Sequence, residues 1–192
     1  VSLLLSKGAS VDSTAGRFGT PLTIAAIKGN PETVRILLAK GANPNHVRGD
    51  GGVPLHFAAS LGHIEVAVQL LDKGADPNKL TADGTSPLIL ATSRRNHALV
   101  TELLSKGADV RYQSPQGWTA LHMAVHKDCA DCVEKLLSSG VDLDSRMSQG
   151  ITPLHVAVGK GDEAMTALLL WSGADIAIKT DAGLDVVDIA NS

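Results

Sequence analysis

Apolar residues in this chain form short runs with helical spacing, and glycines separate the runs. In the stretch 53–78, a first run begins at Pro54 and stops at Gly62, and a second run covers 64–71 and stops before Gly74. A proline suits the first turn of a helix, where its missing N–H would have no partner, and a glycine suits a left-handed helix end. The pattern predicts two short helices joined by a turn and followed by a loop.

This two-helix unit returns every 33 residues. With 19 Gly in 192 residues, one preselected column of six glycines has a chance on the order of one in a million. Such thin units cannot bury a core alone and must stack on one another. The columns that define the period are Leu37, Leu70, Leu103, Leu136 and Leu169, and Gly8, Gly41, Gly74, Gly107, Gly140 and Gly173.

Three of the units begin with closely related sequences at 53–58, 119–124 and 152–157, which follow the pattern T-P-L-H-x-A. Weaker copies at 20–23 and 86–89 lack the His. A period of 33 residues with this pattern resembles the ankyrin repeat. The resemblance implies an all-α solenoid of helix–turn–helix units with short β-hairpin-like loop fingers. It also implies a scaffold for binding another protein on the concave face that the fingers border.

We expect one ankyrin-repeat domain over 1–192. The first residues match the second helix of a unit and the last match a first helix, so we expect a piece of a longer protein. The predicted divisions are a partial repeat and loop at 1–19, complete repeats at 20–52, 53–85, 86–118, 119–151 and 152–184, and a partial repeat at 185–192.

The turn between the two helices is the place where the units differ most. Gly29, Gly62 and Gly161 occupy it in three units, and Arg95 and Asp128 replace them in the other two. If this turn needs a positive φ, Asp is tolerated there and Arg is the costlier choice.

Composition and charge exclude several classes of function. The net charge is −3, so bulk charge predicts neither nucleic acid nor an acidic membrane surface as partner. No apolar run approaches the ~20 residues of a membrane-spanning helix, so we expect no membrane insertion. Two cysteines fit a reducing compartment. We therefore expect an intracellular protein of the cytoplasm or nucleus.

Cys129 and Cys132 form a CxxC pair, with His122 and His126 just upstream. This constellation could be a redox pair or a zinc site. The alternative is that both cysteines are small buried hydrophobes, since free Cys is among the most buried residue types. We favour the buried alternative, because Cys132 takes a small-apolar position of the repeat, and we expect no metal and no cofactor.

Recurrent histidines also argue against an enzyme. His56, His122 and His155 lie at the same position of three repeats, whereas a general base is needed only once. The resemblance implies that this His ties neighbouring loops together. The sequence contains no phosphate-binding loop with GK[ST], no HExxH and no nucleophile elbow. We expect no enzymatic activity.

Trp118 is the first choice for a binding hot spot, because it follows a loop glycine at a position that should face the groove and Trp often anchors interfaces. Basic residues recur near the end of the first helix and predict a positive column that favours an acidic or phosphorylated segment. The alternative is that these cations complement the helix dipole. The predicted partner-binding residues are Arg17, Lys28, Asp50, Leu61, Asp83, Arg94, Gln116, Trp118, His126, Lys127, Gln149, Ile151 and Lys160.

Three further alternatives remain open from the sequence. The chain could be a regulatory or targeting segment of a larger enzyme, channel or tetratricopeptide-containing co-chaperone. Trp171, near the end of a second helix, could mark a different interface. Asn45 and Asn78 are candidates for hydroxylation by the resemblance alone, but the sequence favours turn-forming Asn that bonds its own backbone.

Overall fold

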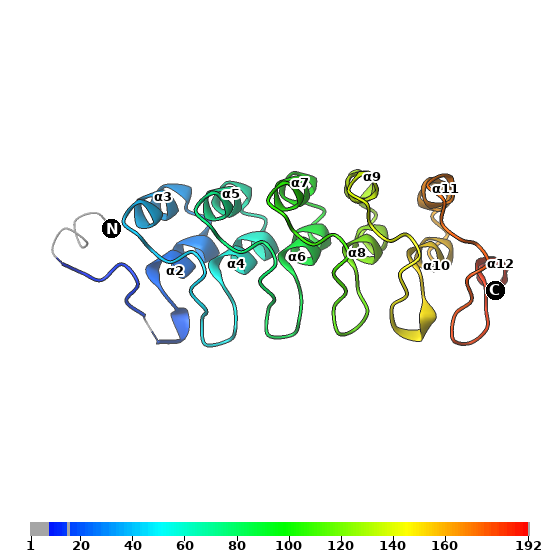
Figure 1. Cartoon of the computed structure of the whole chain (residues 1–192), viewed down its shortest axis with the longest axis horizontal. Coiled ribbons are helices and arrows are strands. Elements are labelled where there is room, and N and C mark those ends of the chain that lie inside the picture. Colours follow the sequence, from blue (N-terminus) through cyan, green and yellow to red (C-terminus); the bar gives the residue numbers. More distant parts are fainter. Residues whose placement is uncertain (1–7, 15, 192) are drawn as a thin grey trace.

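The computed structural model describes residues 8–14 and 16–191, with the Arg17 side chain left out of this description. The second helix expected at the start of the chain lies outside the described residues. Within them, two parallel rows of helices run along the molecule, and loops project from one side (Figure 1). The inner row is α2 (Pro21–Lys28), α4 (Pro54–Leu61), α6 (Pro87–Ser93), α8 (Ala120–His126), α10 (Pro153–Gly159) and α12 (Val186–Ala190). The outer row is α3 (Pro31–Ala39), α5 (Ile64–Asp72), α7 (His97–Ser105), α9 (Ala130–Ser138) and α11 (Glu163–Trp171).

Hydroxyl side chains define where most inner helices begin. The Thr119 hydroxyl accepts from the backbone N–H of His122 at 3.2 Å, and Thr20, Ser86 and Thr152 make the equivalent cap. Val53 has no hydroxyl and makes no such bond. In that unit the His56 Nδ1 accepts from the Val53 N–H at 3.2 Å.

The turns between paired helices adopt the positive φ that the glycines predict. Gly62 has φ 77°, and the replacements Arg95 and Asp128 are held at 56° and 54°. At Arg95 this conformation is unfavourable for a residue with a Cβ atom. The Arg95 guanidinium donates to the Asp128 carbonyl oxygen at 2.8 Å, so the residue gains a bond to the next unit.

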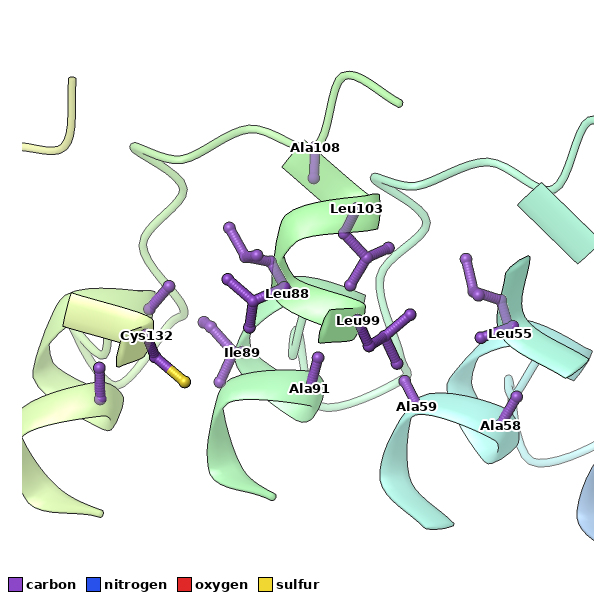
Figure 2. Close-up of a cluster of buried hydrophobic side chains, with 14 of the residues drawn as sticks. Leu55, Ala58, Ala59, Leu88, Ile89, Ala91, Leu99, Leu103, Ala108 and Cys132 are labelled. Carbon is purple, nitrogen blue, oxygen red and sulfur yellow. The ribbon is translucent and has the colours of Figure 1, made fainter. Parts of the chain in front are cut away.

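Burial between neighbouring units forms the core, as the repeat predicts. Leu37 and Leu70 are fully buried, and Leu38 and Leu71 are only 8% and 6% exposed. Figure 2 shows how Leu99 and Leu103 of α7 gather with side chains of α6 and the preceding α4. Each helix pair therefore hides its apolar stripe against the next pair.

The loops are hairpin-like fingers. In one finger the Thr81 N–H donates to the Thr85 carbonyl at 3.0 Å, and the Gly84 N–H donates back to Thr81 at 3.0 Å. The equivalent pair of bonds recurs in the fingers that end at Trp118 and Ile151. Two 3-10 turns, η1 (Gly16–Phe18) and η2 (Ser148–Gly150), also lie in fingers. The part of the chain that the structure describes contains no β-strand, so the all-α prediction is confirmed.

The expectation that Asn45 and Asn78 bond their own backbone is wrong. Asn78 Oδ1 accepts from the Asp109 N–H at 2.7 Å, and its Nδ2 donates to the Gly107 carbonyl at 2.9 Å. Asn45 makes the same two bonds one unit earlier: its Nδ2 donates to the Gly74 carbonyl, and its Oδ1 accepts from the Asp76 N–H. Each asparagine bonds the loop of the next unit, so these residues couple neighbouring repeats.

The first prediction tests burial between units. Leu103→Ala should lower the free energy of unfolding by ~2–5 kcal/mol, because Leu103 is fully buried and the truncation leaves a cavity. Leu61→Ala is the control: Leu61 is 49% exposed, so the loss should stay within ~0.5 kcal/mol. Urea denaturation followed by circular dichroism measures both. Equal losses for the two variants would contradict the stacked core.

The second prediction tests the asparagine bonds. Asn78→Ala should cost ~1–2 kcal/mol of unfolding free energy, because it removes one donor and one acceptor between repeats. Asn78→Asp keeps the acceptor for Asp109 and loses only the donor to Gly107, so its loss should be smaller. Thermal unfolding of the parent, Asn78→Ala and Asn78→Asp at one salt concentration gives the order of their stabilities. An unchanged Asn78→Ala variant would show that these bonds add no stability.

Candidate functional site

The inner helices present an apolar column on the face that borders the fingers. It consists of Phe57, Leu90, Met123 and Val156, each half-buried, with Ile24 as a 37% exposed first member. These residues lie 33 positions apart and are not among the predicted site residues. The sequence does contain a signal for this column, because each unit carries an apolar residue at this position, between the positions that form the core. The column is the floor of a groove.

Three cavities open along this floor, between the fingers and the inner helices. The first, about 350 Å³, is lined by Phe57 and Leu90, and the second, about 210 Å³, by Leu90 and Trp118. The third, about 550 Å³, lies beside α12 and is lined by Val156 and Leu184. The first two cavities share Leu90, so the apolar parts of their linings adjoin in one surface. We name this surface the central groove: Phe57, Leu90, Met123 and Trp118.

Trp118 stands at the base of a finger and forms a wall of the second cavity. Its ring packs edge-on against the His126 ring at a centroid distance of 5.5 Å, and against the His122 ring at 6.3 Å. The indole is half-buried, whereas His126 is exposed. The structure therefore brings together two of the predicted site residues, Trp118 and His126.

Two of the recurrent histidines, His56 and His122, bond a neighbouring finger, as the resemblance implies. His122 Nε2 lies 3.1 Å from the Ile151 carbonyl oxygen, which can only accept, so Nε2 carries the proton. Nδ1 then accepts from the Thr119 hydroxyl at 2.8 Å. Burial lowers the pKa of His122 to about 4 and also lowers the pKa of His56. His56 Nε2 likewise reaches a finger carbonyl, that of Lys79, at 2.6 Å.

The predicted basic column divides into two groups. Lys28 and Arg94 are exposed and Lys127 is half-buried, and none of the three has an ion-pair partner among the described residues. Lys160 instead forms an ion pair with Asp128 and donates to the His126 carbonyl at 2.9 Å. Lys160 thus places its charge at the carboxyl end of α8, which agrees with the alternative that these cations complement a helix dipole.

The fingertip carboxylates have different partners. Asp50 pairs with Arg48, whose hydrogen bond lowers the Asp50 pKa to about 2. The Arg48 guanidinium also lies 4.5 Å from the centroid of the Phe57 ring. Asp83 accepts from the hydroxyls of Thr81 and Thr85 in its own finger, and these bonds lower its pKa.

The other predicted residues lie further along the fingers. Gln116 and Gln149 are exposed; the Gln116 carbonyl accepts from the Ser148 hydroxyl at 2.9 Å. Ile151 is half-buried and lines the third cavity. Leu61 interrupts the basic column with an exposed apolar side chain. The Arg17 side chain lies outside the described part of the structure.

Both cysteines are buried, as expected, but the expectation of free thiols is wrong. Cys129 and Cys132 form a disulfide across the start of α9 and are 5% and 0% exposed. The spacing brings Cys129, the N-cap residue of α9, next to Cys132 at the third position of the helix. Across the described residues, no cluster of three or more His, Cys, Asp or Glu side chains could hold a metal ion.

The remaining aromatic residues differ in exposure. The Tyr112 hydroxyl donates to the Gly84 carbonyl at 2.6 Å, so this ring covers the neighbouring finger. Phe18 is 55% exposed. Trp171 is 87% exposed at the end of α11, away from the central groove. Among the described helices, none is long and apolar enough to cross a membrane.

Comparison with protein families decides what kind of repeat this is. A family model of ankyrin repeats matches residues 1–81, 55–147 and 88–180. The chain belongs to the ankyrin-repeat family. Ankyrin repeats generally mediate protein–protein interaction, and the family is typically non-catalytic. No curated protein matches the chain as a relative.

The third prediction follows from His122 of this ankyrin array. Its pKa is about 4 in the folded chain against 6.5 for the ordinary side chain. Because the unfolded state binds the proton more readily, the stabilising contribution is complete above pH 6.5 and is lost as the pH falls toward 4. The loss should reach roughly 3 kcal/mol. Urea denaturation across this range should show a shallower pH slope for His122→Gln. The same slope in both proteins would contradict the assignment.

Proposed function

We propose that this ankyrin-repeat chain is a non-catalytic intracellular scaffold that binds a partner protein along the central groove. The observation that supports it is the apolar floor that Leu90 and Met123 form beside Trp118, on helices that end at Arg94 and Lys127. Ankyrin-repeat proteins are often intracellular, which supports the proposed compartment. The cysteines no longer support it, because Cys129 and Cys132 form a disulfide. Two of the histidines along the groove, His56 and His122, are engaged in structural hydrogen bonds to finger carbonyls.

Trp118 is the proposed anchor. Its indole is already packed against His126, so binding would immobilise little additional side-chain freedom. The adjoining cavity, about 210 Å³, offers a partner side chain contact with Leu90 and Met123. Aromatic residues in such desolvated positions dominate interface energies.

The cations favour a partner segment that carries acidic or phosphorylated residues. Arg94 and Lys127 directly follow α6 and α8, the helices that contribute Leu90 and Met123 to the second cavity, and make no ion pair within the described chain. Lys160 is already engaged with Asp128, so the proposed positive edge is Lys28, Arg94 and Lys127. Exposed cations of this kind mainly accelerate association with an acidic partner. Asp50, Asp83, Gln116, Gln149 and Ile151 complete the proposed contact surface on the finger side.

The fourth prediction concerns the anchor. Peptides selected by this chain from a random-peptide library displayed on phage should bind Trp118→Ala about tenfold or more weakly, because the variant loses the wall of the cavity. Trp171→Ala is the matched control and should bind as the parent does. Surface plasmon resonance measures both affinities. Loss of binding in Trp171→Ala alone would place the interface on the outer helices.

The fifth prediction concerns charge. Arg94→Glu/Lys127→Glu should slow association with acidic members of the selected peptides, and the difference should shrink as salt is added. The unfolding free energy should barely change, because neither side chain makes an ion pair in the described chain. Stopped-flow tryptophan fluorescence, measured in a Trp171→Phe background so that Trp118 is the reporter, gives the association rates. Equal rates at low salt would contradict the proposed acidic partner.

A further inference from the structure

The two halves of the central groove carry different charges on their finger side. The first cavity is bordered by the carboxylates Asp50 and Asp83, whereas the second is bordered by the neutral Gln116 and Ser114. Leu90 belongs to both cavities, so one bound segment can contact the two in succession. A bound segment therefore contacts two cavities with apolar floors, of which the first has carboxylates on its finger side and the second has neutral polar groups there.

The first cavity retains negative charge. Arg48 compensates Asp50, whereas Asp83 accepts from the hydroxyls of Thr81 and Thr85 and has no cationic partner in the described chain. These hydroxyls also hold the Asp83 carboxylate in one position. Both carboxylates act electrostatically on His56, which lines the same cavity. A neutral or acidic side chain would leave this charge uncompensated.

The walls of the first cavity suit a long side chain. Phe57, Ala82 and Leu90 supply apolar surface inside a volume of about 350 Å³. Lysine and arginine bury their aliphatic stems against such surface while the charged end reaches a polar group. The Asp83 carboxylate lies at the rim that such an end would reach.

We propose that the partner segment inserts a lysine or arginine side chain into the first cavity and an apolar side chain into the second. This inference rests on the proposed function and adds the chemistry of the bound segment. Acidic residues of the same segment face Arg94 and Lys127, at the opposite edge from the fingers. The groove thereby selects a segment by charge on both edges and by an apolar contact between them.

The spacing of the two side chains follows from the spacing of the inner helices. Packed helices such as α4, α6 and α8 have axes ~8–10 Å apart. A polyproline II segment advances ~3.1 Å per residue and returns to the same face every third residue, which spans ~9 Å. The basic and apolar residues are therefore three positions apart in an extended segment. Either chain direction meets this requirement.

A double-mutant cycle tests the inference on the peptides selected from the phage library. The selected sequences should be enriched in Lys or Arg three residues from Leu, Met or Phe. Asp83→Asn should weaken these peptides about fivefold or more. Replacing the peptide's basic residue by Gln should cost as much, and the two changes together should cost no more than either one. Asp131→Asn, on the outer helix α9, is the matched control and should leave affinity unchanged.

The possible failures are separable. Selected peptides that depend on Trp118 but lack a basic residue, or whose basic residue is not coupled to Asp83, would overturn this inference and leave the groove function standing. Peptides that do not depend on Trp118 at all would overturn both. As a reversal test, Asp83→Lys should shift the enrichment at this position from Lys and Arg to Asp and Glu.

Discussion

The whole structure depends on apolar burial between neighbouring repeats. No helix pair is thick enough to have an interior of its own, so Leu55 and Leu70 reach full burial only between adjacent units. This requirement fixes which face of each inner helix is used for stability. The opposite face, where Phe57 and Leu90 lie, is left open to the groove. Function can therefore vary from unit to unit while the stacking contacts stay the same.

Features that recur at the period were predictable from the sequence. Leu103 and Gly74 repeat their type in every unit, and a repeated requirement is most simply a packing or backbone requirement. The positive φ of Arg95 and Asp128 also followed, because they replace glycine at an equivalent position. Contacts between units were less accessible. The sequence around Asn78 suits either a local turn or a bond to the next repeat, and only the distance between stacked loops decides between them.

The candidate site was predicted in part. Trp118 was predicted because it follows a loop glycine at a position that should face the groove, and because Trp often anchors interfaces. The floor was missed, since Met123 or Val156 at helical spacing reads as a core residue in a sequence. Their half-burial becomes clear only when the fingers are placed beside them. The disulfide between Cys129 and Cys132 was not expected either. The repeat pattern showed that the positions are buried, but it did not show that the two side chains point toward each other.

Residues of the inter-helix turns decide which cations remain available to a partner. Lys160 reaches back one repeat and meets Asp128, so its charge is neutralised. The equivalent position for Lys127 is Arg95, which repels an ammonium group, and for Arg94 it is Gly62, which offers no side chain. Basic residues at the same position of successive repeats are therefore paired or unpaired according to the turn residue of the preceding unit. The replacement of glycine in these turns therefore affects more than backbone strain, because it sets where along the groove positive charge is exposed.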